Sequence, residues 1–164
     1  MDLKETNNIH AKRHPWETAR LKALKNILGP QLFEGITALD VGCGDGFISM
    51  NLFDHLRSKD ITAVDINLSD EWIRELDTLT QGIRYQREMP LEGKYDLIML
   101  LDVIEHVESD NTFLADIVDR YVAGNGTVMI TVPAFQSIYG RHDAALGHYR
   151  RYNQKELTGL ATSC

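Results

Sequence analysis

Residues 38–47 read Ala-Leu-Asp-Val-Gly-Cys-Gly-Asp-Gly-Phe, and this stretch decides the fold. The apolar run over residues 36–41 predicts a buried strand, and the apolar residues after Gly46 recur at helical spacing. Between them, Gly42, Gly44 and Gly46 predict a tight turn with positive φ angles, which lets a ligand approach the backbone. The sequence therefore predicts a strand, a turn and a helix start whose first N–H groups favour an anionic ligand group.

A carboxylate at the end of the next strand adds to this pattern. Residues 61–64, Ile-Thr-Ala-Val, predict a second strand, and Asp65 follows it, 19 residues after Gly46. An acid at this distance, on the tip of the second strand, can accept hydrogen bonds from both hydroxyls of a ribose. The glycine turn and Asp65 together predict the nucleoside-binding half of an α/β sheet.

The spacing of the glycines separates two classes of nucleotide-binding protein. The dinucleotide fingerprint is G-x-G-x-x-G, whereas here the glycines stand at alternate positions and Asp40 precedes the first by two residues. This pattern resembles motif I, D/E-x-G-x-G-x-G, of the class I S-adenosylmethionine-dependent methyltransferases, in particular bacterial members of types 11 and 12. Residues 95–107 resemble the fourth strand of that family and its following turn.

The resemblance implies a cofactor, a fold and a set of binding residues. The cofactor is S-adenosylmethionine, and the fold is a Rossmann-like, doubly wound and largely parallel sheet with strand order 3-2-1-4-5. Asp40 is expected to orient the methionine amino group, Asp65 to hold the ribose, and Glu88 to accept the adenine amino group. For Glu88, a solvated loop acid is an equally good interpretation. The implied cofactor-binding residues are Asp40, Gly42, Cys43, Gly44, Gly46, Asp65, Ile66, Glu88, Leu101 and Asp102.

The rest of the chain alternates strands with helices. Residues 83–87, 95–101 and 127–132 predict the third, fourth and fifth strands, and residues 124–126, Gly-Asn-Gly, predict a turn before the last of these. Helical periodicity separates the strands. This alternation implies right-handed crossovers and a parallel sheet.

The first helix is expected to follow a flexible segment over residues 1–14. Pro15 suits the first position of a helix, and Trp16, Leu24, Ile27 and Leu28 predict its apolar stripe. In one interpretation Trp16 anchors this helix to the sheet. In the other, His14 and Trp16 help to cover the substrate, as the leading helix of the resembled family commonly does.

Residues 133–152 form a long polar and aromatic segment after the fifth strand, at the end of the sheet where open α/β folds bind ligands. His142-Asp143 together with residues 147–152, Gly-His-Tyr-Arg-Arg-Tyr, resembles a run in bacterial methyltransferases often associated with glycan or lipid metabolism. An acceptor-binding loop and a simple surface lid are the two interpretations. If the acceptor is a hydroxyl, His106, His142 and His148 are the candidate bases that remove its proton.

Composition and charge limit the classes of molecule that the chain is expected to bind. The formal net charge of −7 disfavours broad contact with nucleic acid. No leader and no apolar run of membrane-spanning length is present, so a cytoplasmic protein is expected. Cys43 and Cys164 predict no disulfide, with Cys43 serving as a small residue in the turn, and no metal-ligand spacing appears, so no metal is expected.

Three functions follow from these patterns. The first is methyl transfer from S-adenosylmethionine to a small-molecule, lipid or glycan acceptor. The alternatives are an NAD(P)-dependent oxidoreductase and a non-catalytic module that only binds the cofactor. The oxidoreductase is disfavoured because its glycine spacing differs from the one found here.

The resembled family has seven strands, whereas only five are predicted here. No apolar β run follows residue 152, so residues 15–164 are expected to be a methyltransferase domain that is C-terminally incomplete, lacking strands six and seven. The fifth strand would then lie at a sheet edge with unpaired backbone groups. Recruitment of a partner strand, dimerisation or aggregation through that edge is the expected consequence.

Overall fold

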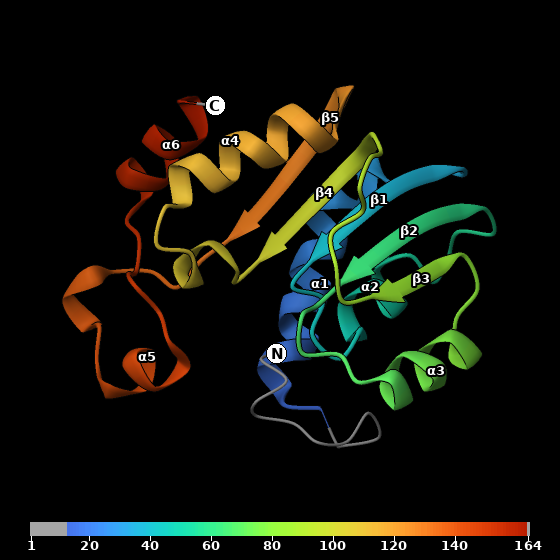
Figure 1. The fold of residues 1–164 in the computed structure, drawn as a ribbon, viewed down its shortest axis with the longest axis horizontal. Helices are drawn as coiled ribbons and strands as arrows, with labels where there is room; N and C mark the ends of the chain where they lie inside the picture. The colour runs from blue at the N-terminus through green and yellow to red at the C-terminus, as the bar shows by residue number, and fades with distance from the viewer. Residues whose placement is uncertain (1–12, 164) are drawn as a thin grey trace. The chain divides into compact units, whose positions relative to one another are not determined.

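A computed structural model describes residues 13–163 of the chain (Figure 1). The chain divides into two compact units, Met1–Pro90 and Leu91–Cys164. The expected flexible segment, residues 1–14, lies almost wholly outside the described residues, as does Cys164.

The first unit alternates helices with three parallel strands. Its elements are α1 (Pro15–Leu28), a 3-10 turn (Gly29–Gln31), β1 (Ile36–Val41), α2 (Phe47–Leu52), β2 (Lys59–Val64), α3 (Asp70–Leu79) and β3 (Ile83–Gln86). β2 lies between β1 and β3 and is parallel to both. The register aligns Val41 with Val64 and Val64 with Gln86, so the three strands end side by side. The residues just after β1 and β2 are therefore neighbours.

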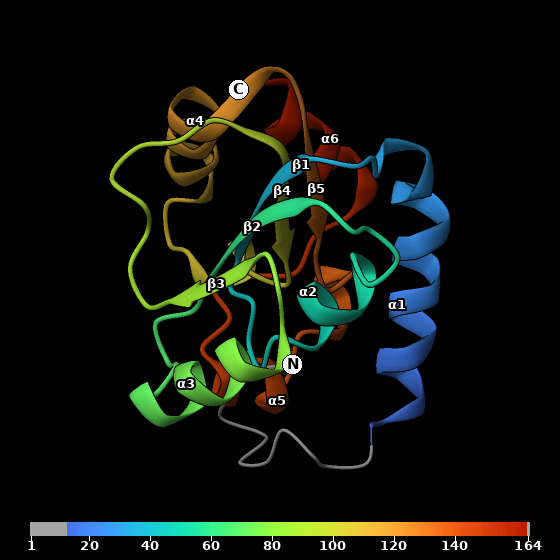
Figure 2. The same cartoon turned by 90° about the vertical axis from the view of Figure 1, so that its right-hand side faces the viewer.

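The core of this unit forms around β1 and β2, whose side chains are mostly buried, as expected of parallel strands covered on both faces. α3 begins after Ser69, whose hydroxyl accepts a hydrogen bond of 3.1 Å from the Trp72 N–H. α1 packs beside α2, and α3 beside β3 (Figure 2).

The buried face of α1 differs from the predicted stripe. Leu24 and Leu28 are buried as predicted, but Trp16 is 46% exposed and Ile27 57% exposed, so the interpretation of Trp16 as the anchor is wrong. Glu17 is buried in its place. The helix can bury this carboxylate because the His14 N–H donates to it at 2.9 Å and Arg13 lies beside it.

The second unit holds the remaining two strands. Its elements are β4 (Tyr95–Leu101), a 3-10 turn (Ile104–His106), α4 (Asp110–Tyr121), β5 (Val122–Thr131), a 3-10 turn (Gln136–Ile138), α5 (Arg141–Leu146) and α6 (Gln154–Thr162). β4 and β5 are parallel neighbours. α4 packs beside β5, and its side chains Leu114, Ile117 and Tyr121 are buried.

The predicted turn at residues 124–126 is instead part of β5. Tyr95 pairs with Val122 and Leu97 with Thr127, so β5 advances five residues while β4 advances two, and three residues bulge out. Gly126 is required there because a Cβ atom would lie 2.7 Å from the Tyr95 carbonyl oxygen. In the part of the chain that the structure describes, β5 has β4 as its single strand neighbour. Dimerisation through β5 stays a prediction.

The observed strand pairs agree with the predicted order. The first unit supplies 3-2-1 and the second supplies 4-5, and every printed pairing is parallel. Beyond β5, the described residues pair as strands only through an isolated bridge between Ala134 and Tyr152. Among residues 13–163, no helix has the length and hydrophobicity that a membrane span requires.

Candidate functional site

The glycine loop, residues 42–46, connects β1 to α2. Gly42, Gly44 and Gly46 have φ angles of 73°, 57° and 76°, which confirms the predicted positive φ at all three. The N–H groups of Gly42 and Cys43 both donate to the Val64 carbonyl, at 2.8 and 3.0 Å. The loop is therefore fixed by backbone hydrogen bonds to the end of β2.

Asp65 lies against the same loop. One carboxylate oxygen accepts from the Gly44 N–H at 2.9 Å, and the other accepts from the Asn67 N–H, also at 2.9 Å. Each oxygen has a second lone pair, so the carboxylate is held in place and can still accept hydrogen bonds from a ligand. This is the arrangement that a ribose-binding acid requires.

Asp40 lies in the buried part of β1, below the loop. The Ser49 hydroxyl donates to its Oδ2 atom, whereas Oδ1 is buried without a hydrogen-bond partner among the described residues. Burial raises the pKa of Asp40 to about 6, against the smaller opposing effect of the Ser49 hydrogen bond. A cationic group close to this carboxylate would stabilise its charged form.

The ring of Tyr85 explains why position 46 is a glycine. A Cβ atom on Gly46 would lie 2.9 Å from Cε1 of Tyr85, and the positive φ disfavours any other residue. Burial also raises the pKa of the Tyr85 hydroxyl. Tyr85 on β3 thus packs directly against the end of the glycine loop.

Cys43 is a buried, free cysteine inside the loop. Burial raises the pKa of its thiol well above the usual range, and the nearby Asp40 acts in the same direction. A thiol held protonated in this way is a poor nucleophile. Cys43 is therefore a small residue that fits the turn, as the sequence predicts.

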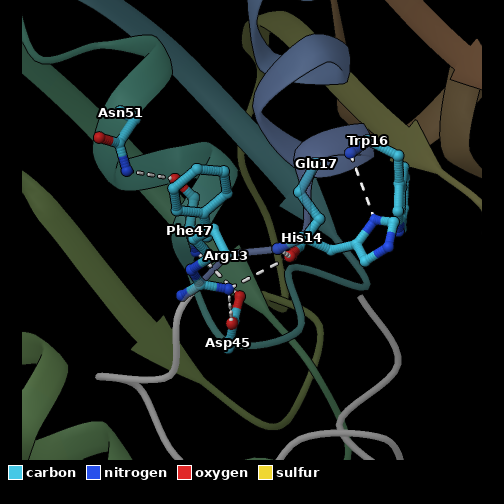
Figure 3. A network of polar contacts seen from close by, with 7 residues as sticks. All are labelled: Arg13, His14, Trp16, Glu17, Asp45, Phe47 and Asn51. Atoms are coloured by element: carbon cyan, nitrogen blue, oxygen red, sulfur yellow. Dashed lines mark hydrogen bonds and ion pairs between the residues drawn. The ribbon is translucent and has the colours of Figure 1, made fainter.

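Arg13 connects α1 to the glycine loop (Figure 3). Its guanidinium pairs with Asp45 and, at 3.4 Å, with Glu17, and it lies 4.3 Å from the centre of the Phe47 ring. A small pocket next to this network is lined by Trp16, Glu17, Arg20, Cys43, Asp45, Phe47 and Ile48. Sequence reasoning missed Arg13 because it stands in a polar stretch without periodicity.

Four other predicted cofactor residues lie at strand ends. Ile66 and Glu88 are exposed, after β2 and β3 respectively. Leu101 is the last residue of β4, and Asp102 follows with a φ of 59°. Asp102 is held to β5, because its N–H donates to the Thr131 carbonyl at 2.9 Å and its Oδ1 accepts from the Thr131 hydroxyl at 3.0 Å.

The 133–152 loop belongs to the second unit and is hydrogen-bonded to other parts of it. The Tyr152 N–H donates to the Pro133 carbonyl at 3.0 Å, and the Tyr152 hydroxyl donates to Asp110 at 2.8 Å. The Tyr149 N–H donates to the Glu105 carbonyl at 2.7 Å. The loop is therefore joined to the segment that follows β4.

The Asp143 carboxylate contacts three other residues of this loop through polar contacts. The carboxylate is 1% exposed and accepts from Arg151 Nε at 2.8 Å and from the Gly140 N–H at 2.9 Å. It also contacts Nδ1 of His148 at 3.0 Å. The Arg151 guanidinium, together with these hydrogen bonds, holds the pKa of Asp143 well below its usual range.

Two of the three predicted histidines come together. The rings of His106 and His148 pack edge to face, with centres 4.6 Å apart, and the Glu105 carboxylate joins them. Ligand atoms of Glu105, His106 and His148 lie within 4.8 Å of one another. His142 is exposed on α5 and does not belong to this cluster.

Comparison with known proteins finds a family model described as a methyltransferase domain, which matches residues 11–162. One relative is a ubiquinone biosynthesis O-methyltransferase from Maricaulis maris (strain MCS10), 33% identical over 54% of this chain and 37% of its own length. Another, of the same name from Rickettsia felis, is 26% identical over 80% of this chain and 61% of its own length. The chain thus spans less than two thirds of these relatives.

Among solved structures, a Burkholderia thailandensis 1,6-didemethyltoxoflavin-N1-methyltransferase with bound 1,6-didemethyltoxoflavin and S-adenosylhomocysteine matches with a TM-score of 0.70. The two sequences are 23% identical over 90% of this chain and 68% of that one. At this identity the likeness shows the fold. The predicted Rossmann-like α/β class is confirmed.

Proposed function

Since the chain belongs to the methyltransferase domain family, we propose that it binds S-adenosylmethionine and transfers the methyl group to an oxygen atom of a small-molecule acceptor. The observation that carries the proposal is the glycine loop with Asp65 locked against it. The φ angle is positive at all three glycines, and the Asp65 carboxylate is oriented by the Gly44 and Asn67 N–H groups.

The residues present fit the cofactor in two further respects. S-adenosylmethionine carries an ammonium group, and Asp40 is a buried carboxylate with a raised pKa and an oxygen that has no hydrogen-bond partner among the described residues. Gly42, at the start of the loop, is exposed and has no side chain that would obstruct a ligand. We assign Asp40 to the methionine amino group, Asp65 to the ribose, and the backbone at the glycines to the parts between them.

Glu88, Ile66, Leu101 and Asp102 complete the proposed cofactor set. Glu88 and Ile66 are exposed at the ends of β3 and β2, where they are available to a ligand. Asp102 is ordered by Thr131, which suits a residue that has to face a ligand from a strand end. The exact adenine contact is tested by Glu88→Ala, for which we expect weaker cofactor binding.

The cofactor, once bound, supplies a methyl group on a positively charged sulfonium, already activated for displacement. The chain contributes position and exclusion of water. Transfer to a hydroxyl forms an O–CH3 bond, breaks the S–CH3 bond and releases the hydroxyl proton. His106, His142 and His148 are the proposed bases for that proton.

Two observations support an oxygen atom on an apolar acceptor. The relatives that match are named O-methyltransferases of ubiquinone biosynthesis. The 133–152 loop also carries three large side chains, Phe135, Ile138 and Tyr149. Each is more than half exposed and is therefore available for contact with an acceptor. A hydroxylated aromatic compound fits both observations better than a sugar does.

The direct test is methyl transfer from S-[methyl-3H]adenosylmethionine to three acceptor classes: hydroxylated aromatic compounds, long-chain alcohols and monosaccharides. We expect label in the aromatic class, released as volatile methyl on ether cleavage. Label only in the alcohols or sugars would overturn the proposed acceptor. Tight cofactor binding with no transfer to any class, or to a cell extract, would instead favour the non-catalytic binding module.

A further inference from the structure

Three side chains with metal-binding chemistry converge in the second unit. Glu105 and His106 belong to the 3-10 turn after β4, and His148 comes from the 133–152 loop. We propose that Glu105, His106 and His148 form a binding site for a divalent transition-metal ion, with Zn²⁺ as the expected ion. This site lies within the second unit and goes beyond the proposed function, in which His106 and His148 are candidate bases.

The distances suit an ion once the ligand atoms have moved closer together. The three ligand atoms lie within 4.8 Å of one another. A tetrahedral ion with ligand distances of about 2.1 Å holds its ligand atoms about 3.4 Å apart. The ligand atoms therefore have to approach one another by up to about 1.4 Å when an ion binds.

The strongest support is the way in which His148 is held. Nδ1 of its ring lies 3.0 Å from an Asp143 carboxylate oxygen, and that carboxylate is itself fixed by Arg151 and by the Gly140 N–H. Metal-binding histidines almost always donate their second ring N–H to such a carboxylate, which sets the tautomer and the orientation of the ring. With Nδ1 bound to Asp143, Nε2 is the atom that carries the lone pair for an ion.

The backbone holds the two halves of the site together. The Tyr149 N–H donates to the Glu105 carbonyl at 2.7 Å, so the residue after His148 is joined to the residue before His106. The His106 N–H donates to the Val103 carbonyl at 3.0 Å, closing the 3-10 turn. These bonds bring together side chains that are 42 residues apart in sequence, His106 and His148.

Burial points to the same chemistry. Glu105 is fully buried, and the His148 side chain is 9% exposed. Proteins bury carboxylates where they are paired or coordinate a metal.

The ligand set selects the kind of ion. Two imidazoles and one carboxylate suit Zn²⁺, Co²⁺, Ni²⁺ or Fe²⁺, whereas Mg²⁺ and Ca²⁺ prefer oxygen ligands alone. Three protein ligands leave one position of a tetrahedral ion for water or another oxygen ligand. Ion binding uses the same nitrogen lone pairs that a general base needs, so a metal ligand and a free base are competing roles for these two histidines.

The test uses protein freed of metal by chelation and dialysis, titrated with Co²⁺ for its visible absorption and with Zn²⁺ by calorimetry. We expect one ion per chain and the intense absorption of a four-coordinate Co²⁺ site. His148→Ala and His106→Ala should each weaken binding by at least 100-fold, and Asp143→Asn by about 10- to 100-fold.

His142→Ala is the matched control, because His142 lies on the same loop but is exposed and outside the cluster. It should bind the ion as the unchanged chain does. Glu105→Gln removes the charge but keeps the side-chain volume, so that the packing around the residue is retained. Circular dichroism checks that each variant is folded. No stoichiometric binding, or equal loss in His142→Ala and His148→Ala, would overturn the site and leave His106 and His148 as bases.

Discussion

One buried aspartate, Asp40, lies under the glycine loop and another, Asp143, lies in the 133–152 loop, and the two carboxylates have opposite electrostatic environments. Asp40 lies under the glycine loop with one hydroxyl donor, and burial raises its pKa to about 6. Asp143 lies in the 133–152 loop with an arginine, a backbone N–H and a histidine, which hold its pKa well below the usual range. The first carboxylate is short of a cationic partner, and the second already has one.

This difference separates a ligand-binding charge from a structural one. A buried carboxylate without a cationic partner lowers the stability of the folded chain. Proteins commonly retain such carboxylates at functional sites. A buried carboxylate with a full set of donors fixes the chain around it. We therefore expect substitutions at Asp143 to affect folding and those at Asp40 to affect ligand binding and its dependence on pH.

The largest effect is expected for Asp143→Ala. The change leaves Arg151 and His148 without their shared partner, and breaking a buried ion pair costs about 3–5 kcal/mol of unfolding free energy. Urea unfolding measures it. Asp116→Ala is the matched control, because its pair with Arg120 is exposed and such pairs contribute about 0–1 kcal/mol. Similar losses in both variants would contradict the structural role of Asp143.

Asp40→Asn should change the pH dependence of stability. Because the pKa of Asp40 is raised from 3.8 to about 6, the folded chain binds more protons than the unfolded chain between about pH 4 and 6, and stability falls as pH rises through that window. The shift corresponds to about 3 kcal/mol, by which Asp40→Asn should gain on the unchanged chain from pH 4 to 7. Urea unfolding at several pH values measures the difference, and a flat difference would rule out the assigned pKa.

The same carboxylate should link cofactor binding to pH. The ammonium group of S-adenosylmethionine favours the charged form of Asp40, so affinity is expected to fall as pH drops below about 6. In Asp40→Asn this part of the pH dependence should disappear.

A smaller effect is expected at the end of the glycine loop. Gly46→Ala places a Cβ 2.9 Å from Cε1 of Tyr85 at a φ of 76°, which should cost about 1–2 kcal/mol of stability. Gly159→Ala, in α6, meets no atom within 4 Å and should stabilise by roughly 0.5–1 kcal/mol. Thermal unfolding compares the two. Changes of opposite sign are the expected pattern, and destabilisation by both would remove the special role of position 46.

The same contrast explains what the sequence predicted. The glycine loop is set by neighbouring residues and by backbone hydrogen bonds to the next strand, so its φ angles were predicted from local patterns, whereas the strand order was implied by the family resemblance. The bulge in β5 was missed because an Asn flanked by two glycines is also a common turn sequence, and only the approach of Gly126 to Tyr95 distinguishes the two. Burial of Glu17 in place of Trp16 depends on Arg13, which no periodicity marks.

The 133–152 loop was predicted only in part. Its polar and aromatic composition after a strand identified it, but the partners of its side chains come from a segment about 40 residues earlier in the chain. The expectation of no metal rested on the spacing of neighbouring positions, which does not indicate that Glu105 and His106 meet His148 through tertiary contacts. Asp143 was noted only as part of the His142-Asp143 pair in the family resemblance, which did not predict its buried partners.

Isothermal titration calorimetry of the unchanged chain and of Asp65→Ala tests whether the glycine loop and Asp65 bind S-adenosylmethionine. The unchanged chain should bind S-adenosylmethionine at one site and NADH not at all. Asp65→Ala should lose roughly 1.5–3 kcal/mol of binding free energy, while Asp77→Ala, which removes an exposed acid from α3, should bind as before. Equal affinity in the folded Asp65→Ala variant, or binding of NADH in preference, would contradict the account.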